Sequence, residues 1–237
     1  MILAIDCGNT RVKWGMREAH APGWRALGAV PLAGIGHLGD EWNSLPAPSR
    51  IVIANVAGEH ARAALCGVLA RFGVEPVWIR SRAAQCGVSN GYADPGQLGA
   101  DRWAALIGAW QLQHAACLVV NAGTATTVDM LSSAGEFRGG IILPGVDIMK
   151  RALATNTAGL PLAAGRFADE PRCTADAIES GCLHAQAGAI ERMFARLEPG
   201  AVCLLSGGNA GRVRPILNIP LRAVDNLALE GLVRMVA

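Results

Sequence analysis

The chain has 237 residues, 51% of them hydrophobic, which is enough to bury a substantial core in one large domain or two small ones. Its formal net charge is only +2 with the basic residues spread along the sequence, and this distribution argues against a nucleic-acid-binding protein. The uncharged stretch before Asp6 is too short for a signal peptide and no apolar run approaches a membrane span, so we expect a soluble, cytoplasmic protein.

Segments rich in valine and isoleucine alternate with helical segments along the chain, and this alternation is typical of an α/β fold. The predicted strands are residues 1–6, 11–16, 50–56, 117–121, 126–131, 140–143 and 201–205. The predicted helices are residues 59–72, 101–116, 146–156, 175–197 and 227–235. Between the second and third strands, residues 21–42 are expected to be an irregular excursion. A boundary just before Cys117 would divide the chain into two domains, 1–116 and 117–237.

A similar turn follows two of the predicted strands. The first reads DCGNT from Asp6 and the second reads NAGTATT from Asn121, with Gly8 and Gly123 at equivalent positions. This repetition predicts an internal duplication of a unit that begins with a β-hairpin. Glycines directly after predicted strands can adopt positive φ and can let a ligand approach the backbone. They are Gly8, Gly123, Gly207 and Gly208.

The residue types in these turns suit the binding of phosphate groups. Backbone N–H groups and the Thr10 hydroxyl can bind phosphate oxygens, and the Asp6 carboxylate can orient hydrated Mg²⁺. Lys13 can reach the same negatively charged phosphate. An ordinary hairpin explains the first turn equally well, because Gly and Asn are favoured in tight turns. The second turn, with Thr124 beside Gly123, favours nucleotide binding, since two such turns together can hold a polyphosphate. The sequence contains no Walker loop, and no G-x-G-x-x-G motif opens a predicted helix directly after a predicted strand.

The stretch PGQLGADRW, residues 95–103, places Asp101 and Arg102 at the start of a predicted helix. The simplest interpretation is that Asp101 compensates the helix dipole, which is worth about 0.3–1 kcal/mol. The alternative is catalytic. In that case Asp101 accepts the proton of a substrate hydroxyl while Arg102 binds an anionic group of the substrate, a role that a positioned Asp can take in phosphoryl transfer.

The remaining candidates each have a plain structural explanation. SGGNA, from Ser206, suits a flat ring that approaches the backbone, or it is an ordinary strand-to-helix turn. Tyr92 is the only tyrosine and lies in a predicted loop, where it is a ligand contact or a partly buried aromatic residue. The seven cysteines form no Cys-x-x-Cys pair and are typical of reduced thiols. The five histidines, His20 among them, show no metal-ligand spacing, so we predict no metal site built from His or Cys.

Taken in chain order, these motifs resemble those of the type III pantothenate kinases, a family within the acetate and sugar kinase/Hsp70/actin superfamily. The matching elements are DCGNT with Lys13, then Tyr92, the PxxGxDR pattern of Pro95, Gly99, Asp101 and Arg102, then GTATT, GGIILPG and SGGNA. The resemblance covers essentially the whole chain. It implies an α/β fold of two related ribonuclease-H-like (actin-like ATPase) domains with a nucleotide cleft between them. The implied activity is the ATP-dependent phosphorylation of the hydroxyl of pantothenate to phosphopantothenate, the first step of coenzyme A biosynthesis.

The resemblance also implies roles for individual residues. Asp101 would be the general base, Arg102 would bind the pantothenate carboxylate, and Asp6 would hold Mg²⁺ through water. The implied ATP- and phosphate-binding residues are Asp6, Cys7, Gly8, Asn9, Thr10, Arg11, Val12, Lys13, Thr124, Gly207 and Gly208. The implied pantothenate-binding residues are Tyr92, Gly99, Ala100, Asp101, Arg102 and Thr174. For Thr174, which opens a predicted helix, an N-cap role is an equally good local interpretation.

Related kinases use a monovalent cation, K⁺ or NH₄⁺, that is commonly held by an Asp at the start of the second turn. This sequence has Asn121 there, an uncharged ligand, so the cation requirement stays open. The resemblance further implies a homodimer that binds pantothenate and ATP. Two other classes of protein are alternatives: a non-catalytic, nucleotide-binding regulatory protein that assists transcription, and an actin-like assembly protein. The presence of Asp6, Asp101 and Arg102 together favours an active kinase, since a binding module needs no base for a hydroxyl.

Overall fold

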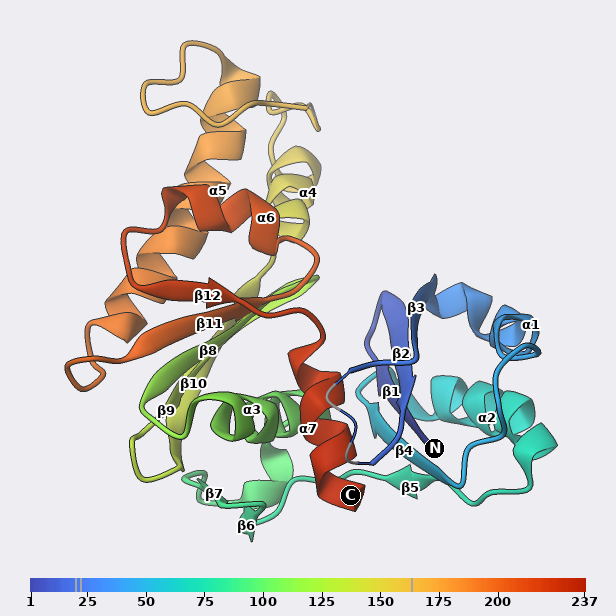
Figure 1. Ribbon diagram of the computed structural model, residues 1–237. Coiled ribbons are helices and arrows are strands. Elements are labelled where there is room, and N and C mark those ends of the chain that lie inside the picture. The colour runs from blue at the N-terminus through green and yellow to red at the C-terminus, as the bar shows by residue number, and fades with distance from the viewer. Residues whose placement is uncertain (20, 22, 163) are drawn as a thin grey trace. The chain divides into compact units, whose positions relative to one another are not determined.

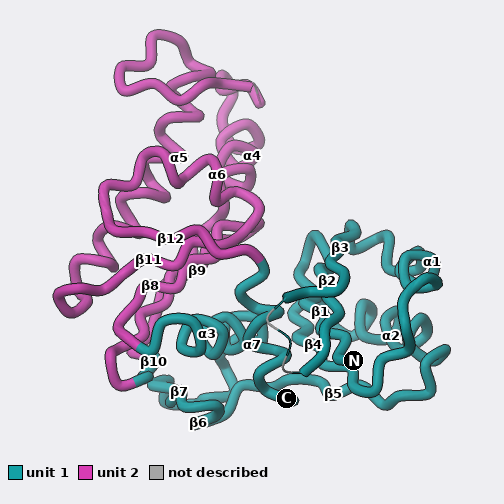
Figure 2. The backbone as a smooth tube through the Cα atoms, viewed as in Figure 1, with its two compact units in different colours: residues 1–114, 135–137, 226–237 teal, residues 115–134, 138–225 magenta. Residues whose placement is uncertain are grey.

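The computed structural model describes residues 1–19, 21, 23–162 and 164–237, so His20, for which no metal role was predicted, lies outside it. The chain forms two compact units (Figure 2). The first contains residues 1–114, 135–137 and 226–237, and the second contains residues 115–134 and 138–225. The sequence-based domain boundary before Cys117 stays a prediction. Residues 226–237, at the C-terminal end of the chain, belong to the first compact unit.

Five strands form the sheet of the first unit, in the order β3-β2-β1-β4-β5. They are β1 (Ile2–Cys7), β2 (Arg11–Arg17), β3 (Ala26–Pro31), β4 (Arg50–Asn55) and β5 (Val77–Trp78). Strand β1 is central, because it pairs antiparallel with β2 and parallel with β4. Its alternating side chains are buried on both faces of the sheet: Leu3 and Ile5 belong to one hydrophobic cluster, and Ile2 and Ala4 to another.

Helices cover both faces of this sheet. Those of the first unit are α1 (Leu38–Glu41), α2 (Gly58–Leu69), α3 (Ala100–Gln113) and α7 (Leu227–Val236), with short 3₁₀ turns η1 (Leu32–His37), η2 (Ala70–Phe72) and η3 (Pro95–Gln97). Helix α2 presents Ala61, Leu65 and Leu69, one residue per turn, to the cluster of Leu3. Ala104 of α3 and Leu232 of α7 pack on the opposite face.

Helices α3 and α7 lie side by side in Figure 1 and pack unusually closely. A Cβ added to Gly231 would overlap the carbonyl oxygen of Ala104, and one added to Gly108 would overlap that of Leu227. Only glycine permits this approach of the two backbones. The close packing holds the C-terminal helix within the first unit.

The second sheet has the strand order β12-β11-β8-β9-β10-β7-β6. Its strands are β6 (Ala84–Gln85), β7 (Val88–Asn90), β8 (Cys117–Ala122), β9 (Ala125–Leu131), β10 (Glu136–Pro144), β11 (Val202–Ser206) and β12 (Leu221–Ala223). The part β10-β9-β8-β11-β12 repeats the order β3-β2-β1-β4-β5 of the first sheet. In both sheets the central strand pairs antiparallel with the next strand of the chain and parallel with another. This equivalence supports the predicted duplication.

The second unit has its own core. Its helices are α4 (Val146–Asn156), α5 (Thr174–Phe194) and α6 (Ala210–Val213), followed by the 3₁₀ turn η4 (Arg214–Ile216). Ile178, Cys182 and Ile190 of α5 share one buried cluster with Val120 of β8 and Leu205 of β11. Within the part of the chain that the structure describes, none of the helices combines the length and apolar character that crossing a membrane requires.

All the predicted strands and helices are present, and α4 has the predicted bounds. The expectation of an irregular excursion at residues 21–42 was wrong, because β3 lies there and pairs with β2. Strand β3 has the pattern Ala-Leu-Gly-Ala-Val-Pro and buries only Val30, so its sequence carries little alternation. The very short strands β5, β6, β7 and β12 were also missed.

Candidate active site

The first turn closes the hairpin between β1 and β2. Asp6, partly buried, lies directly across from Lys13, and the Gly8 N–H donates to the Arg11 carbonyl oxygen at 3.1 Å. Asn9 is exposed at the tip of the turn with Thr10, while Cys7 and Val12 are buried and Arg11 is exposed. Gly8 does not use the positive φ that glycine permits. A Cβ there would meet the Arg11 carbonyl oxygen at 3.4 Å.

The start of α3 lies at the carboxyl ends of β1 and β4. A Cβ added to Gly99, the N-cap residue, would lie 2.6 Å from Asp101 Oδ1 and 3.8 Å from Val56 Cγ1. Val56 follows β4 and donates its N–H to the carbonyl oxygen of Cys7 at 3.0 Å. The Asp101 carboxylate is thus held at the sheet edge where ligands commonly bind in α/β folds, and glycine at position 99 leaves it room.

Asp6 and Asp101 are close enough to interact electrostatically. Burial, and secondly the charge of Asp101, raise the pKa of Asp6 to about 7, although Lys13 opposes the shift. Burial also raises the pKa of Asp101, against the opposing effects of the Arg102 N–H, which donates to Asp101 Oδ1 at 2.8 Å, and of the Arg102 charge. Perturbed carboxylates that share one site are typical of catalytic groups. The burial of Cys7 itself, and secondly the charge of Asp6, raise the pKa of the Cys7 thiol to about 11.

Arg102 is buried beneath two aromatic rings. Its Nη1 donates to the Tyr92 hydroxyl at 3.2 Å, and its guanidinium carbon lies 5.8 Å from the ring centroids of both Tyr92 and Phe137. The two rings are 5.1 Å apart. The Tyr92 N–H donates to Asn90 Oδ1 at 3.1 Å, which fixes the loop. The structure therefore brings Tyr92, Asp101 and Arg102 together in the first unit, with Ala100 as the first residue of α3.

The second turn, between β8 and β9, is held by two other segments of its unit. The Gly145 N–H, at the N-cap of α4, donates to the Thr124 carbonyl oxygen at 2.9 Å. From the other side, the Asn209 N–H donates to the Ala122 carbonyl oxygen at 2.8 Å and Asn209 Nδ2 donates to that of Gly123 at 3.2 Å. Main-chain and side-chain amide hydrogen bonds thus fix the Gly123–Thr124 turn. Thr124 itself is exposed.

Of the glycines Gly123, Gly207 and Gly208 that follow strands of this unit, Gly207 uses the positive φ that glycine permits. Its φ is +105°, and a Cβ there would lie 2.6 Å from the carbonyl carbon of Ala122. Gly123 and Gly208 do not adopt left-handed φ. Gly208 is exposed and has open space where a Cβ would stand. Gly207 is therefore required by a close backbone crossing, whereas Gly208 is free of packing constraints.

Asn121 occupies the position in the second unit that Asp6 occupies in the first. Each is one residue before the last antiparallel pair of its hairpin, Asp6 across from Lys13 and Asn121 across from Thr127. Each also pairs in parallel with the neighbouring strand, Asn121 with Ser206. Among the described residues, no group of three or more His, Cys, Asp or Glu side chains forms a metal cluster.

Thr174 lies in the second unit. It is the exposed first residue of α5, and the N-cap position belongs to Cys173, so the N-cap interpretation was wrong by one residue.

Three residues with clear structural roles at the site were missed by sequence reasoning: Val56, Phe137 and Asn209. Asn209 had a signal in the SGGNA motif, but Val56 and Phe137 are ordinary core types with none.

Comparison with known proteins places the chain among kinases. A family model described as type III pantothenate kinase matches residues 2–196. A type III pantothenate kinase of Aromatoleum aromaticum is 57% identical over 234 residues, which are 98% of this chain and 96% of the relative.

Two solved structures share the fold at low identity. A putative Baf family transcriptional activator of Campylobacter jejuni has a TM-score of 0.62 and 18% identity over 99% of this chain and 96% of its own. A putative 2-dehydro-3-deoxygalactonokinase of Sinorhizobium meliloti has a TM-score of 0.60 and 16% identity, covering 98% and 97% of the two chains. The predicted fold class, α/β with two related domains of the actin-like ATPase and sugar kinase type, is confirmed.

Proposed function

Because this chain belongs to the type III pantothenate kinase family and phosphorylates pantothenate with ATP in coenzyme A biosynthesis, we propose that Asp101 is the general base for the pantothenate hydroxyl. The observation that carries the proposal is the raised pKa of a carboxylate held at the carboxyl ends of β1 and β4. A carboxylate whose pKa is raised above its ordinary value is a stronger base than an ordinary carboxylate and accepts a proton more readily. The regulatory alternative, a non-catalytic nucleotide-binding protein, is not favoured by these relatives.

Arg102 is proposed to bind the carboxylate of pantothenate, with Tyr92, Gly99 and Ala100 lining the same pocket. Support comes from the position of Arg102 next to the proposed base and from its fixed orientation against Tyr92. A guanidinium can hold a carboxylate through two parallel hydrogen bonds, so substrate and base would be aligned by neighbouring residues of one helix turn. The resemblance adds Thr174, whose exposed hydroxyl at the start of α5 is available to a ligand.

The first turn is proposed to bind ATP phosphates through Asp6 to Lys13, with Mg²⁺ held by Asp6 through water. The donor chemistry fits, since Mg²⁺ prefers carboxylate oxygens and few protein ligands. The electrostatics support it as well, because burial and the charge of Asp101 raise the pKa of Asp6 and Lys13 only partly opposes them, so a bound cation would favour the ionised carboxylate. When bound, Mg²⁺ would neutralise phosphate charge. Lys13, across the hairpin, would add a second positive charge for the phosphates.

In the second unit, Thr124 is proposed to contact the ATP phosphates and Gly207 and Gly208 to lie against the adenosine. Support comes from the exposed hydroxyl-bearing turn and from the open space beside Gly208. Asn121 is the proposed, weakened ligand of a monovalent cation, because its position corresponds to that of Asp6 but its amide carries no charge. We expect K⁺ or NH₄⁺ to bind there only loosely.

A homodimer in the cytoplasm is the remaining proposal. Ile141 and Ile142 of β10 are 36% and 62% exposed, and because successive side chains of a strand point to opposite faces, each offers an apolar contact to a second copy on its own face. All seven cysteines are free thiols, which fits a reducing compartment.

The assignment of Arg102 is tested with the primary-alcohol analogue of pantothenate, which lacks the carboxylate. Arg102→Lys should raise the KM for pantothenate by about tenfold or more, since an ammonium cannot reproduce bidentate binding. With the analogue, wild type and variant should have similar KM values. The readout is ADP release with each acceptor and without acceptor. If Arg102→Lys raised the KM for pantothenate and the KM for the analogue by the same factor, Arg102 would not be the residue that binds the carboxylate.

A further inference from the structure

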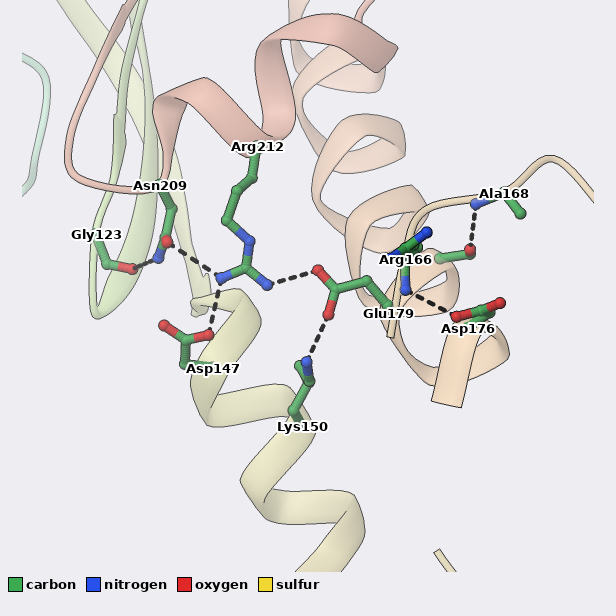
Figure 3. A network of polar contacts seen from close by, with 10 residues as sticks. Gly123, Asp147, Lys150, Arg166, Ala168, Asp176, Glu179, Asn209 and Arg212 are labelled. Carbon is green, nitrogen blue, oxygen red and sulfur yellow. Dashed lines mark hydrogen bonds and ion pairs between the residues drawn. The ribbon is translucent and has the colours of Figure 1, made fainter. Parts of the chain in front are cut away.

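Four charged side chains of the second unit form a cluster on three helices (Figure 3). Arg212 of α6 donates to Asp147 Oδ1 at 2.8 Å and to Glu179 Oε1 at 2.7 Å. Lys150 of α4 donates to Glu179 Oε2 at 2.5 Å. Two acids are thus balanced by two bases. We use the name charge cluster for Asp147, Lys150, Glu179 and Arg212.

Glu179 is the buried centre of the charge cluster. Its side chain is only 8% exposed, and each of its oxygens accepts from a different cation. Burial raises the pKa of Glu179, but the hydrogen bonds from Lys150 and Arg212 outweigh it, so the net pKa lies below its ordinary value. Burying ions costs free energy that their mutual attraction often only offsets. Net stability is therefore a poor explanation of the charge cluster, and a role in fixing position is a better one.

Arg212 connects the charge cluster to the Gly123–Thr124 turn by two routes. In the first, Arg212 Nη1 donates to Asn209 Oδ1 at 3.3 Å, and Asn209 Nδ2 donates to the Gly123 carbonyl oxygen at 3.2 Å (Figure 3). Because Asn209 Oδ1 accepts from Arg212, the amide is oriented with its donor toward the turn.

The second route passes through α4. Arg212 holds Asp147 in the first turn of that helix, and the N-cap residue Gly145 donates its N–H to the Thr124 carbonyl oxygen at 2.9 Å. A Cβ on Gly145 would lie 2.5 Å from the same oxygen, so the helix start is in direct contact with the turn. Arg212 thereby closes a ring of contacts that includes both residues of the turn.

We propose that Arg212, held in place by Glu179, is the positioning residue of the Gly123–Thr124 turn and therefore of the ATP phosphates that this turn binds. The inference rests on the proposed function of Thr124. Arg212 acts through Asn209 and α4 and makes no contact with the phosphates itself. Phosphoryl transfer depends on alignment of the phosphate chain, so loosening the turn weakens ATP binding and misaligns the transferred group.

Arg212→Lys tests the inference with the charge retained. The lysine ammonium can still compensate Glu179, but it cannot also reach Asp147 and Asn209 in the fixed fork of a guanidinium. We expect the KM for ATP to rise about tenfold and kcat to fall, with the KM for pantothenate unchanged. A merely structural role would lower the melting temperature without changing the KM for ATP. Arg138→Ala is the matched control, because its ion pair with Glu198 in the same unit is long, at 3.7 Å, and exposed.

Asn209→Ala provides a second variant if Arg212→Lys folds poorly. It breaks one of the two routes, so it should reproduce part of the rise in the KM for ATP. The double variant should rise little beyond Arg212→Lys, which already weakens both routes. Additive effects, or an unchanged KM for ATP in both folded variants, would overturn the inference. Thr124→Ala separates the two claims: if it alone raises the KM for ATP, the proposed function stands and the inference fails. If Thr124→Ala has no effect on the KM for ATP, the proposed role of the turn fails and the inference falls with it.

Discussion

Replacing Asp6 by Asn should stabilise the folded protein at neutral pH while removing a proposed Mg²⁺ ligand. In the folded chain, burial first and Asp101 second raise the pKa of Asp6 from 3.8 to about 7. Between these values the folded state retains a proton that the unfolded chain releases, so the free energy of unfolding falls as the pH rises. The slope is about 1.4 kcal/mol per pH unit, which predicts a loss of about 2–3 kcal/mol between pH 5 and pH 7. An asparagine at position 6 does not titrate, so the variant should not lose this part of its free energy of unfolding as the pH rises.

Urea unfolding of wild type and Asp6→Asn near pH 5 and near pH 8, without nucleotide or Mg²⁺, measures the effect. The variant should gain about 2–3 kcal/mol relative to wild type on moving to the higher pH. Asp40→Asn, at an exposed carboxylate of α1, is the control. It retains Asp6, so its stability difference from wild type should be the same at both pH values. If the stability difference between Asp6→Asn and wild type were the same at both pH values, the electrostatic description of the site would be refuted.

Two further predictions concern the second unit. Gly207→Ala should lower the free energy of unfolding by about 3 kcal/mol, because it adds a positive-φ penalty to a clash with the backbone of Ala122, whereas Gly208→Ala should change it by less than about 0.5 kcal/mol. Urea unfolding compares the two, and equal losses would contradict the assigned backbone crossing. K⁺ should stimulate ADP release only weakly in wild type and more strongly in Asn121→Asp, since a carboxylate adds charge to the cation site. A steep K⁺ requirement in wild type that Asn121→Ala abolishes would show that the site is not weakened.

Sequence reasoning succeeded where local chemistry determines the structure. Strand β1 is a run of apolar residues that ends in a Gly-Asn turn, and α4 begins directly after Pro144 and Gly145, so both could be located from one stretch of sequence. It failed where distant contacts decide. Strand β3 has weak alternation and forms because β2 offers it an edge. Glycine permits a left-handed conformation at Gly8 and Gly123, but their turns close without one, which the sequence does not reveal.

The candidate site shows the same division. Asp6, Asp101 and Arg102 were recognisable because carboxylates and a guanidinium stand next to glycine turns in the sequence. The contacts that orient them were not. Phe137 reaches Arg102 from a strand that follows α3 in the chain, and Arg212 meets Glu179 across 33 positions. Such pairs depend on how helices and strands pack, which no local spacing reveals.

The most direct test of Asp101 as the general base is the turnover of Asp101→Asn at saturating ATP and pantothenate. The amide keeps the size of the side chain and an oxygen for the Arg102 N–H, but it cannot accept the proton of the hydroxyl. We predict that kcat falls by about 100-fold or more, while the KM values for ATP and pantothenate change by less than about threefold. A kcat close to that of wild type, with ADP release still dependent on pantothenate, would contradict the assignment of Asp101 as the base.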